Sequence, residues 1–269
     1  MLKQRVITAA IFIPIVVFVI WFGDPCFSLF IAAVVLLGTS EFYRVSGNLD
    51  LRQPLVYLGL LWALALALSP HYVNSGVLPA VVTTATVISL VWLLCRPLQE
   101  DAFRKWAWVV AGVLYVGWLL GYWLNLRMLP GGRGWVYLAM FTTFANDTAA
   151  FFIGRVWGKR KLIPAISPAK TWEGTLGGLL TAVVVTVAIS RIPILFSYSP
   201  LEYWQAILLG CLISVFAQLG DLVESLLKRN MRIKESGELL PGHGGILDRF
   251  DSLIFTGVVV YYYIVWLME

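Results

Sequence analysis

Residues 225–252 have the sequence SLLKRNMRIKESGELLPGHGGILDRFDS, the longest strongly polar run in a chain that is 59% hydrophobic. Apolar segments at residues 203–219 and 252–267 flank this run, and both are expected to cross a bilayer as helices. The run combines five Lys and Arg residues, a His-Gly-Gly sequence and two aspartates three positions apart. An ordinary connecting loop does not need this density of charge and glycine, whereas a site for metal and phosphate does. The run therefore predicts a polar site beside the membrane.

The bulk composition indicates a membrane protein. The chain has 269 residues, a mean hydropathy of +0.82 and 13% charged residues, about half the charged fraction of a soluble globular protein. Twelve Trp and eleven Tyr suit a protein that is anchored at two membrane interfaces. Cys26, Cys95 and Cys211 have no metal-binding or disulfide spacing, so the composition excludes a zinc site and a disulfide scaffold.

A helix needs about 20 mostly apolar residues to cross a bilayer, and by this measure we predict an all-α, polytopic membrane helix bundle with about nine transmembrane helices, the third of them short. The expected spans are residues 6–22, 26–45, 55–68, 77–95, 106–124, 135–153, 174–189, 203–219 and 252–267. The first segment follows a basic start, as a signal peptide does, but no clear A-x-A cleavage site follows it. A retained first helix is therefore the favoured interpretation.

The distribution of basic residues predicts the orientation. With the N-terminus in the cytoplasm, all but three of the 20 Lys and Arg residues fall on the cytoplasmic side, as the positive-inside rule requires. The three exceptions are Arg127, Arg133 and Arg191. We therefore predict a cell (inner or plasma) membrane protein whose site faces the cytoplasm. Residues 1–134 are expected to form a scaffold and residues 135–269 a catalytic region.

Asp147 lies inside the sixth apolar segment. An ionised carboxylate there costs a few kcal/mol, about 3 on the most lenient scale, so a functional role beside a cation is the first hypothesis. The alternative is a hydrated aspartate at a helix end.

The sequence SPAKTWEG at residues 167–174 predicts a phosphate site. Pro168 favours a turn, and Thr171 is suited to cap the helix that follows. Lys170 would then lie at a helix N-terminus, where free N–H groups and the helix dipole favour anions. Ser167 and Thr171 join Lys170 as candidate phosphate-binding residues. For the nearby basic residues the favoured interpretation is topological: Arg155, Lys159, Arg160 and Lys161.

A second polar stripe begins at the end of the eighth span. Asp221, Glu224, Ser225 and Lys228 have the spacing i, i+3, i+4, i+7 and so share one face of a helix. The alternative is a solvated face on a helix that extends beyond the membrane. Lys228 and the adjacent Arg229 are candidate phosphate ligands.

The His-Gly-Gly run precedes two further carboxylates. Gly244 and Gly245 permit close approach of the backbone to a ligand. Asp248 and Asp251 share one face if the last helix starts near Ile246, and two such carboxylates repel each other unless a cation lies between them. Oxygen ligands favour Mg²⁺ over zinc.

The sequence leaves the roles of two residues, His243 and Glu41, undecided. His243 is either a turn residue or, less favoured, a proton carrier that contacts phosphate. Glu41, near the inner end of the second span, is either a supporting group of a polar cavity or a side chain that reaches the interface.

These residues resemble the phosphatidate cytidylyltransferase (CDP-diacylglycerol synthase) family. The positions that match its main signature are Ser225, Lys228, Arg229, Lys234, Gly237, His243, Gly244, Gly245, Asp248, Arg249 and Asp251. Those that match the upstream pattern are Asp147, Gly154, Ser167, Lys170 and Glu173. Glu235 stands where the pattern has Asp, and Phe151 stands where Tyr is common. The resemblance covers about the last half of the chain.

The resemblance implies condensation of CTP with phosphatidic acid to CDP-diacylglycerol and pyrophosphate, on a lipid bilayer and without nucleic acid. We expect Asp221, Asp248 and Asp251 to hold Mg²⁺, with Asp147 close by, and Lys170 to act with these aspartates in catalysis. A second cation and a homodimer are left open.

Two alternatives are kept. A CTP-dependent polyprenol or lipid kinase would transfer the γ-phosphate and release CDP instead of pyrophosphate. An ion-coupled transporter would also carry buried carboxylates, but such transporters show paired halves, whereas here the polar features lie in the second half of the chain.

Overall fold

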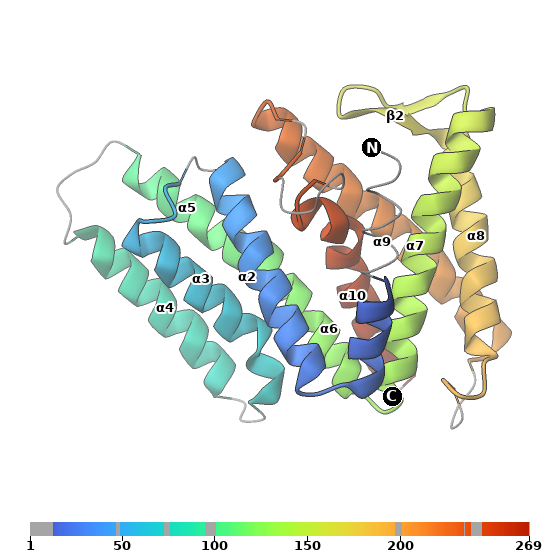
Figure 1. Cartoon of the computed structure of the whole chain (residues 1–269), viewed down its shortest axis with the longest axis horizontal. Coiled ribbons are helices and arrows are strands. Elements are labelled where there is room, and N and C mark those ends of the chain that lie inside the picture. Colours follow the sequence, from blue (N-terminus) through green and yellow to red (C-terminus); the bar gives the residue numbers. More distant parts are fainter. Residues whose placement is uncertain are drawn as a thin grey trace. The chain divides into compact units, whose positions relative to one another are not determined.

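The structure is a computed structural model, and it describes residues 13–46, 49–72, 76–94, 101–196, 201–233, 235–237 and 244–268. Helices dominate it, as the ribbon in Figure 1 shows. Helix is the expected state of these apolar segments, because a bilayer offers no water to the backbone and a helix satisfies its N–H and C=O groups internally. The prediction of an all-α, multi-pass membrane protein is confirmed.

Seven of the described helices are long and apolar enough to cross a membrane. Their spans are Cys26–Val45, Val77–Leu94, Ala102–Met128, Gly132–Trp157, Trp172–Ser190, Tyr203–Asn230 and Leu247–Leu267. At the other two expected positions the described helices are shorter, Ile13–Phe22 and Pro54–Ala67. The 14 residues of the latter rise about 21 Å, less than the ~30 Å of a hydrocarbon core. The expected start of the first span, residue 6, lies outside the described residues.

The chain forms two compact units. Unit 1 comprises Met1–Leu124 and Ile233–Asp248, and unit 2 comprises Asn125–Arg232 and Arg249–Glu269. The elements of unit 1 begin with the helix Ile13–Phe22, followed by α2 (Cys26–Ser46), α3 (Pro54–Ala67), the 3-10 helix η1 (Ser69–His71), α4 (Val77–Leu94), α5 (Ala102–Gly112), the π-helix η2 (Val113–Trp118) and the first part of α6 (Leu119–Met128). Those of unit 2 are α7 (Gly132–Trp157), β1 (Lys161–Ile163), β2 (Ser167–Thr171), α8 (Trp172–Ser190), α9 (Tyr203–Asn230) and most of α10 (Leu247–Leu267). The division into a scaffold and a catalytic region concerns roles and stays a prediction.

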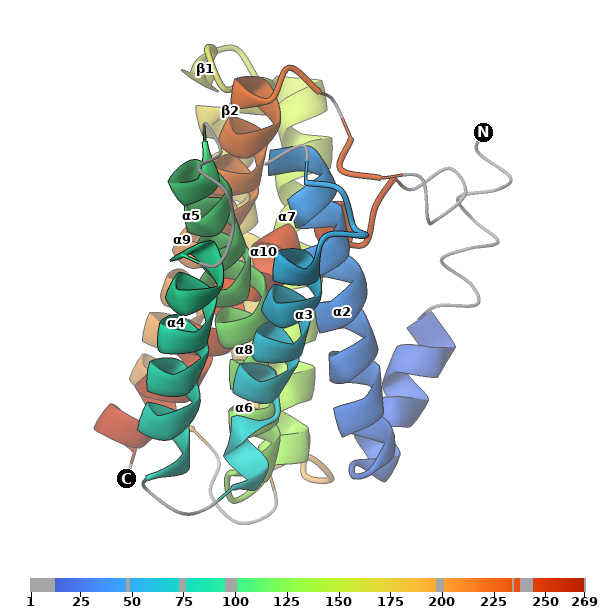
Figure 2. The ribbon, with the colours of Figure 1, turned by 90° about the vertical axis from the view of Figure 1, so that its left-hand side faces the viewer.

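Unit 1 is held together by close contacts between small residues. Figures 1 and 2 show α3 between α2 and α4. On its other contact face, Ala63 and Ala67 of α3 meet Gly117 and Gly121, which lie one helical turn apart. A Cβ placed on Gly117 would lie 2.7 Å from the Ala63 Cα atom. Pairs of small residues four apart let membrane helices approach closely enough for backbone contact.

We expect Gly117→Ala to destabilise unit 1 by about 1–3 kcal/mol, because the added methyl group overpacks a contact made with backbone atoms. The thermal unfolding temperature of the purified protein in detergent measures this effect. Gly76→Ala is the matched control, since a Cβ at Gly76 would meet nothing within 4 Å. Equal unfolding temperatures for the two variants would contradict the assignment of this contact.

Unit 2 is organised around α7. This helix packs along α8 and also contacts α9. Buried hydroxyl pairs join its helices: Thr142 Oγ1 lies 3.1 Å from Thr186 Oγ1, and Thr143 Oγ1 donates to Thr256 Oγ1 at 3.2 Å. Hydrogen bonds of this kind between membrane helices contribute about 0.6 kcal/mol each. They also fix which faces of α7 meet α8 and α10.

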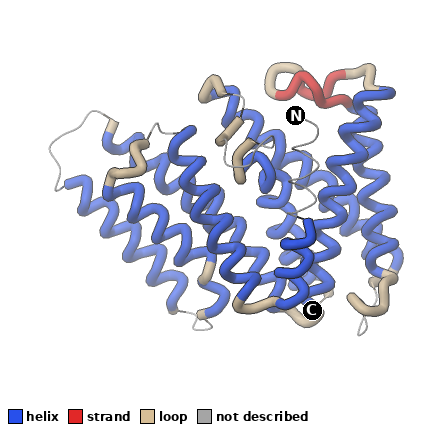
Figure 3. Tube along the Cα trace, in the orientation of Figure 1, coloured by secondary structure: helices blue, strands red, loops and turns tan. Residues whose placement is uncertain are grey.

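A short hairpin connects α7 to α8, and its two strands are drawn in red in Figure 3. Its strands are antiparallel, with Lys161 opposite Thr171 and Ile163 opposite Ser167. The expectation of a turn at Pro168 is wrong, because Pro168 lies within β2 and the turn is made by residues 164–166. Proline is tolerated here since both strands of a two-stranded sheet are edge strands, in which a missing N–H can face away from the partner.

Candidate functional site

Four carboxylates gather in unit 2, and we call them the acidic cluster: Asp147 of α7, Asp221 and Glu224 of α9, and Asp251 of α10. Asp251 interacts electrostatically with the other three members. Asp147 interacts in the same way with Asp221. The structure therefore brings together three of the four predicted metal-binding residues, from three different helices.

Two lysines compensate part of this charge. Lys170 Nζ lies 2.9 Å from Asp221 Oδ2, and Lys228 Nζ lies 2.6 Å from Glu224 Oε2. The Glu224 side chain is fully buried, so its pairing with Lys228 is shielded from solvent. In the described part of the chain, four clustered carboxylates thus meet two paired lysines. This balance of charge suits an additional cation.

The acidic cluster has the kind of ligand atoms that suit Mg²⁺, but the positions of its side chains do not form a metal site. Carboxylate oxygens are the donors that hard divalent cations prefer. Among the described residues, however, no three His, Cys, Asp or Glu side chains are close enough to hold one ion together. A magnesium site formed by Asp147, Asp221, Asp248 and Asp251 therefore stays a prediction.

A buried amide network supports Asp147. The Asn146 side chain is fully buried, and its Nδ2 donates to Asp147 Oδ1 at 2.9 Å. Asn146 Oδ1 accepts a hydrogen bond from Ser214 Oγ at 2.7 Å. Gln218 Nε2 donates to Ser214 Oγ at 3.0 Å and to the Thr175 carbonyl oxygen at 3.3 Å.

This network was not predicted from the sequence, although a signal for it exists. Ser214, Gln218, Asp221 and Ser225 follow one another at intervals of four, three and four residues. That spacing continues the polar stripe of α9 backwards into its apolar half. The helical periodicity of the polar residues therefore predicts Ser214 and Gln218 as members of the same face of α9.

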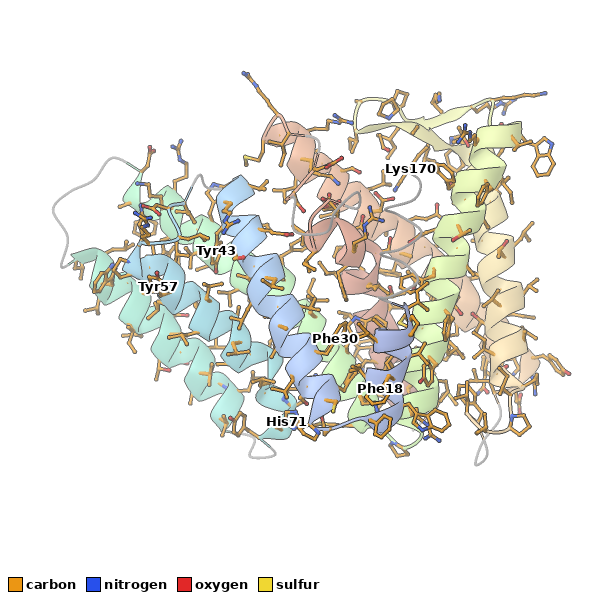
Figure 4. All side chains as sticks on the ribbon, viewed as in Figure 1. Phe18, Phe30, Tyr43, Tyr57, His71 and Lys170 are labelled. Atoms are coloured by element: carbon orange, nitrogen blue, oxygen red, sulfur yellow. The ribbon has the colours of Figure 1, made fainter. Side chains whose placement is uncertain are left out.

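The start of α8 confirms one local prediction. Thr171 is the N-cap, and its Oγ1 accepts a hydrogen bond from the Gly174 N–H at 3.2 Å. Lys170, labelled in Figure 4 at the hairpin end of unit 2, directly precedes this cap. Its Nζ is directed to α9, where it also donates to the Gln218 carbonyl oxygen at 3.4 Å. Lys170 therefore links the hairpin to Asp221.

Other residues of the SPAKTWEG run hold the hairpin in place. The Glu173 carboxylate accepts hydrogen bonds from the backbone N–H groups of Lys159 at 3.1 Å and Arg160 at 3.2 Å. Ser167 pairs with Ile163 across the sheet. This part of the motif has a structural role whether or not it also contacts phosphate.

The predicted phosphate-binding residues at the end of α9 also contact protein groups. Arg229 Nε donates to the carbonyl oxygen of Ile166 in the hairpin turn at 3.1 Å, and Lys228 pairs with Glu224. Ser225 Oγ donates to Asp221 Oδ1 at 3.2 Å. The helical spacing predicted for this stripe is confirmed, and Lys170 and Ile166 of the hairpin contact this part of α9.

In unit 1, Asp248 organises the loop before α10. Its Oδ2 accepts hydrogen bonds from the Ser236 N–H at 2.9 Å, the Ser236 hydroxyl at 3.0 Å and the Gly245 N–H at 2.9 Å. Gly244 has a φ of +78°, a conformation that favours glycine. The helix begins at Leu247, as expected, so Asp248 and Asp251 occupy positions i and i+3 of α10. The roles of Gly244 and Gly245 in phosphate binding stay predictions. Lys234 and His243 lie outside the described residues.

Glu41 of α2 is the second residue that the sequence analysis left unassigned. Its side chain is 1% exposed. Oε1 accepts a hydrogen bond from the Ile246 N–H at 3.0 Å, and Oε2 accepts one from the Leu247 N–H at 2.9 Å. Its position within an apolar segment was the available signal, because buried carboxylates in membrane helices need specific partners.

Comparison with known proteins gives a consistent result along the whole chain. The model of the "Cytidylyltransferase family" matches residues 3–267. A phosphatidate cytidylyltransferase of Bacillus subtilis (strain 168) is 33% identical over 97% of both chains. The protein of that name from Pseudomonas aeruginosa (strain PAO1) is 37% identical over 99% of this chain and 97% of its own. One from Staphylococcus haemolyticus (strain JCSC1435) is 32% identical over 95% and 96%.

Proposed function

Because this chain belongs to the cytidylyltransferase family, we propose that it condenses CTP with phosphatidic acid to give CDP-diacylglycerol and pyrophosphate. The observation that carries the proposal is the similarity, over nearly the full length, to proteins named phosphatidate cytidylyltransferase. The resemblance first seen in the polar motifs is thereby confirmed. Seven long apolar helices agree with a substrate that resides in a bilayer.

The reaction forms one P–O bond and breaks another. An oxygen of the lipid phosphate attacks the α-phosphorus of CTP, and the bond between this phosphorus and the oxygen that bridges to the β-phosphate breaks. Pyrophosphate leaves with the electron pair. The lipid phosphate is already largely ionised near pH 7, so the reaction needs no strong general base. This agrees with a site rich in carboxylates and lysines.

The main barrier is the approach of two polyanions. A site that binds both must supply positive charge at the phosphates, where positioning and electrostatic stabilisation contribute most of the catalysis. Lys170, Lys228 and Arg229 lie on the hairpin and α9, next to the acidic cluster. We expect these side chains to exchange their present protein partners for substrate phosphates.

The acidic cluster would hold Mg²⁺. Asp147, Asp221 and Asp251 would supply oxygen ligands from unit 2, and the sequence predicts Asp248, three residues before Asp251 on α10, as a further ligand. A bound Mg²⁺ neutralises charge on the triphosphate. The residues themselves orient one another: Asn146 holds Asp147, Ser225 holds Asp221, and the Ser252 N–H donates to Asp251 Oδ1 at 2.7 Å. A second cation is left open.

We propose that the site faces the cytoplasm of a cell (inner or plasma) membrane. The basic residues near the site, on the hairpin and at the end of α9, agree with the positive-inside rule. CTP is available on that side. A homodimer remains a prediction from the sequence.

The transporter and the lipid kinase are the alternatives. The family match favours cytidylyl transfer over both. A kinase would release CDP from CTP, whereas a cytidylyltransferase releases pyrophosphate. The product therefore separates the two reactions.

We expect the purified protein to release pyrophosphate and form CDP-diacylglycerol from CTP and phosphatidic acid in mixed detergent micelles. Addition of EDTA should abolish both products, and excess Mg²⁺ should restore them, because the substrates repel each other without a cation. The measurement follows pyrophosphate and the nucleotide products together. Release of CDP without CDP-diacylglycerol would support the kinase, and activity that persists in EDTA would exclude the magnesium site.

A further inference from the structure

The buried carboxylate of Glu41 makes an unusual contact for a side chain in an apolar helix. It accepts hydrogen bonds from two consecutive backbone N–H groups, those of Ile246 and Leu247, at the first turn of α10. These N–H groups have no partner within the helix, and the helix dipole favours a negative charge at this end. Glu41 thus anchors the start of α10 to α2, both within unit 1.

The described residues of the loop before α10, 235–237 and 244–246, lie close to this carboxylate. Ser236 Oγ lies 3.4 Å from Glu41 Oε2, and its shorter contact, at 3.0 Å, is with Asp248 Oδ2. A Cβ on Gly237 would lie 2.8 Å from Glu41 Oε1, and a Cβ on Gly245 would lie 2.5 Å from Glu41 Oε2. Gly237 and Gly245 therefore allow the backbone to approach Glu41, which explains two glycines of the polar run.

The same loop residues hold Asp248. Ser236 donates to Asp248 through its backbone N–H and its hydroxyl, and Gly245 donates through its N–H. Ser236 thus contacts both carboxylates, and Gly245 lies against both. A shift of Ser236 and Gly245 away from Glu41 displaces the groups that orient Asp248.

We propose that Glu41 is a positioning residue for the reaction, which acts by holding the Ser236–Gly245 contacts and the first turn of α10 so that Asp248 keeps its orientation. This inference rests on the proposed function, in which Asp248 contributes to the magnesium site. Glu41 does not touch the reacting atoms. Its contribution is the placement of another carboxylate.

The test compares Glu41→Gln with the wild-type protein. Glutamine has the same shape but places an NH₂ group against N–H donors, so it loses at least one of the two anchoring hydrogen bonds. We expect faster hydrogen exchange in the peptide that covers residues 244–250. We also expect kcat to fall about 10–100-fold, with the KM for phosphatidic acid unchanged. The Mg²⁺ concentration that gives half-maximal activity should rise.

A double-mutant cycle identifies the route of the effect. If Glu41 acts through Asp248, Glu41→Gln combined with Asp248→Asn is no slower than Asp248→Asn alone. Glu41→Asp keeps the negative charge on a shorter side chain. Its hydrogen exchange and its activity should therefore lie between those of the wild-type protein and those of Glu41→Gln. The proposal would be overturned if the two substitutions lowered the rate by factors that multiply in the double variant. Wild-type hydrogen exchange and wild-type activity in Glu41→Gln would also overturn it.

Ser89→Ala is the matched control for a general loss of stability. The buried Ser89 hydroxyl accepts a hydrogen bond from Trp106 Nε1 at 2.8 Å within unit 1, away from the loop. Its removal should lower the unfolding temperature but leave exchange at residues 244–250 and the Mg²⁺ requirement unchanged. An effect like that of Glu41→Gln would reduce Glu41 to a structural residue. If the wild-type protein forms no product, the proposed function is wrong. Hydrogen exchange at residues 244–250 does not depend on turnover, so it tests the contacts of Glu41 separately.

Discussion

Asp251→Asn should lower the rate of cytidylyl transfer about 10²-fold or more while it raises the unfolding temperature of the protein. The rate falls because the site loses a carboxylate that we assign to cation binding, and the loss of one preorganised electrostatic group typically costs this much. The unfolding temperature rises because Asp251 interacts with three other carboxylates. Asparagine removes this repulsion and still accepts the hydrogen bond from the Ser252 N–H.

Opposite signs for activity and stability make this prediction specific. A residue with only a structural role would lose stability and activity together, whereas a strained functional site gains stability when it is disabled. The measurements are initial rates over a range of Mg²⁺ concentrations and thermal unfolding in detergent. Near-normal rates at saturating Mg²⁺ would remove Asp251 from the set of metal ligands.

Asp101→Asn is the control for this variant. Asp101 makes an exposed ion pair with Arg104 at 2.7 Å, and exposed pairs contribute about 0–1 kcal/mol. The same chemical change outside the acidic cluster should leave both the rate and the unfolding temperature close to wild type.

Lys170→Met should lower kcat/KM for CTP about 10²-fold and destabilise the protein by about 1–3 kcal/mol. The stability falls because Asp221 loses its partner at 2.9 Å and remains beside other carboxylates. The catalytic loss follows if Lys170 meets the phosphates of CTP in the reaction. Steady-state kinetics and thermal unfolding measure the two effects separately.

A second substitution separates the two roles of Lys170. In the double variant Lys170→Met with Asp221→Asn, the unpaired charge is gone, so stability should return while activity stays low, because both side chains are assigned to the site. Recovery of activity along with stability would mean that the pair only holds the hairpin to α9. Lys159→Met, the same change at an exposed lysine of the hairpin region, should leave kcat/KM unchanged.

Several local features were predictable because they depend on neighbouring residues. The Thr171 cap follows from a threonine directly before a helix, and the α9 stripe follows from helical periodicity. The start of α10 was placed correctly at the end of the His-Gly-Gly run. The turn expected at Pro168 was wrong because the pairing of β2 with β1, a partner strand, overrides the local preference of proline.

The amino-acid sequence alone determined that this protein is a helical membrane protein with a charged site, since hydropathy, helical periodicity and motif spacing are properties of the chain itself. The tertiary structure decided which charges meet. Lys170 reaches Asp221, and Glu41 reaches the start of α10, 206 positions away. Such pairs depend on how helices pack in three dimensions, because a hydrogen bond or ion pair forms only where two side chains come within about 3 Å of each other.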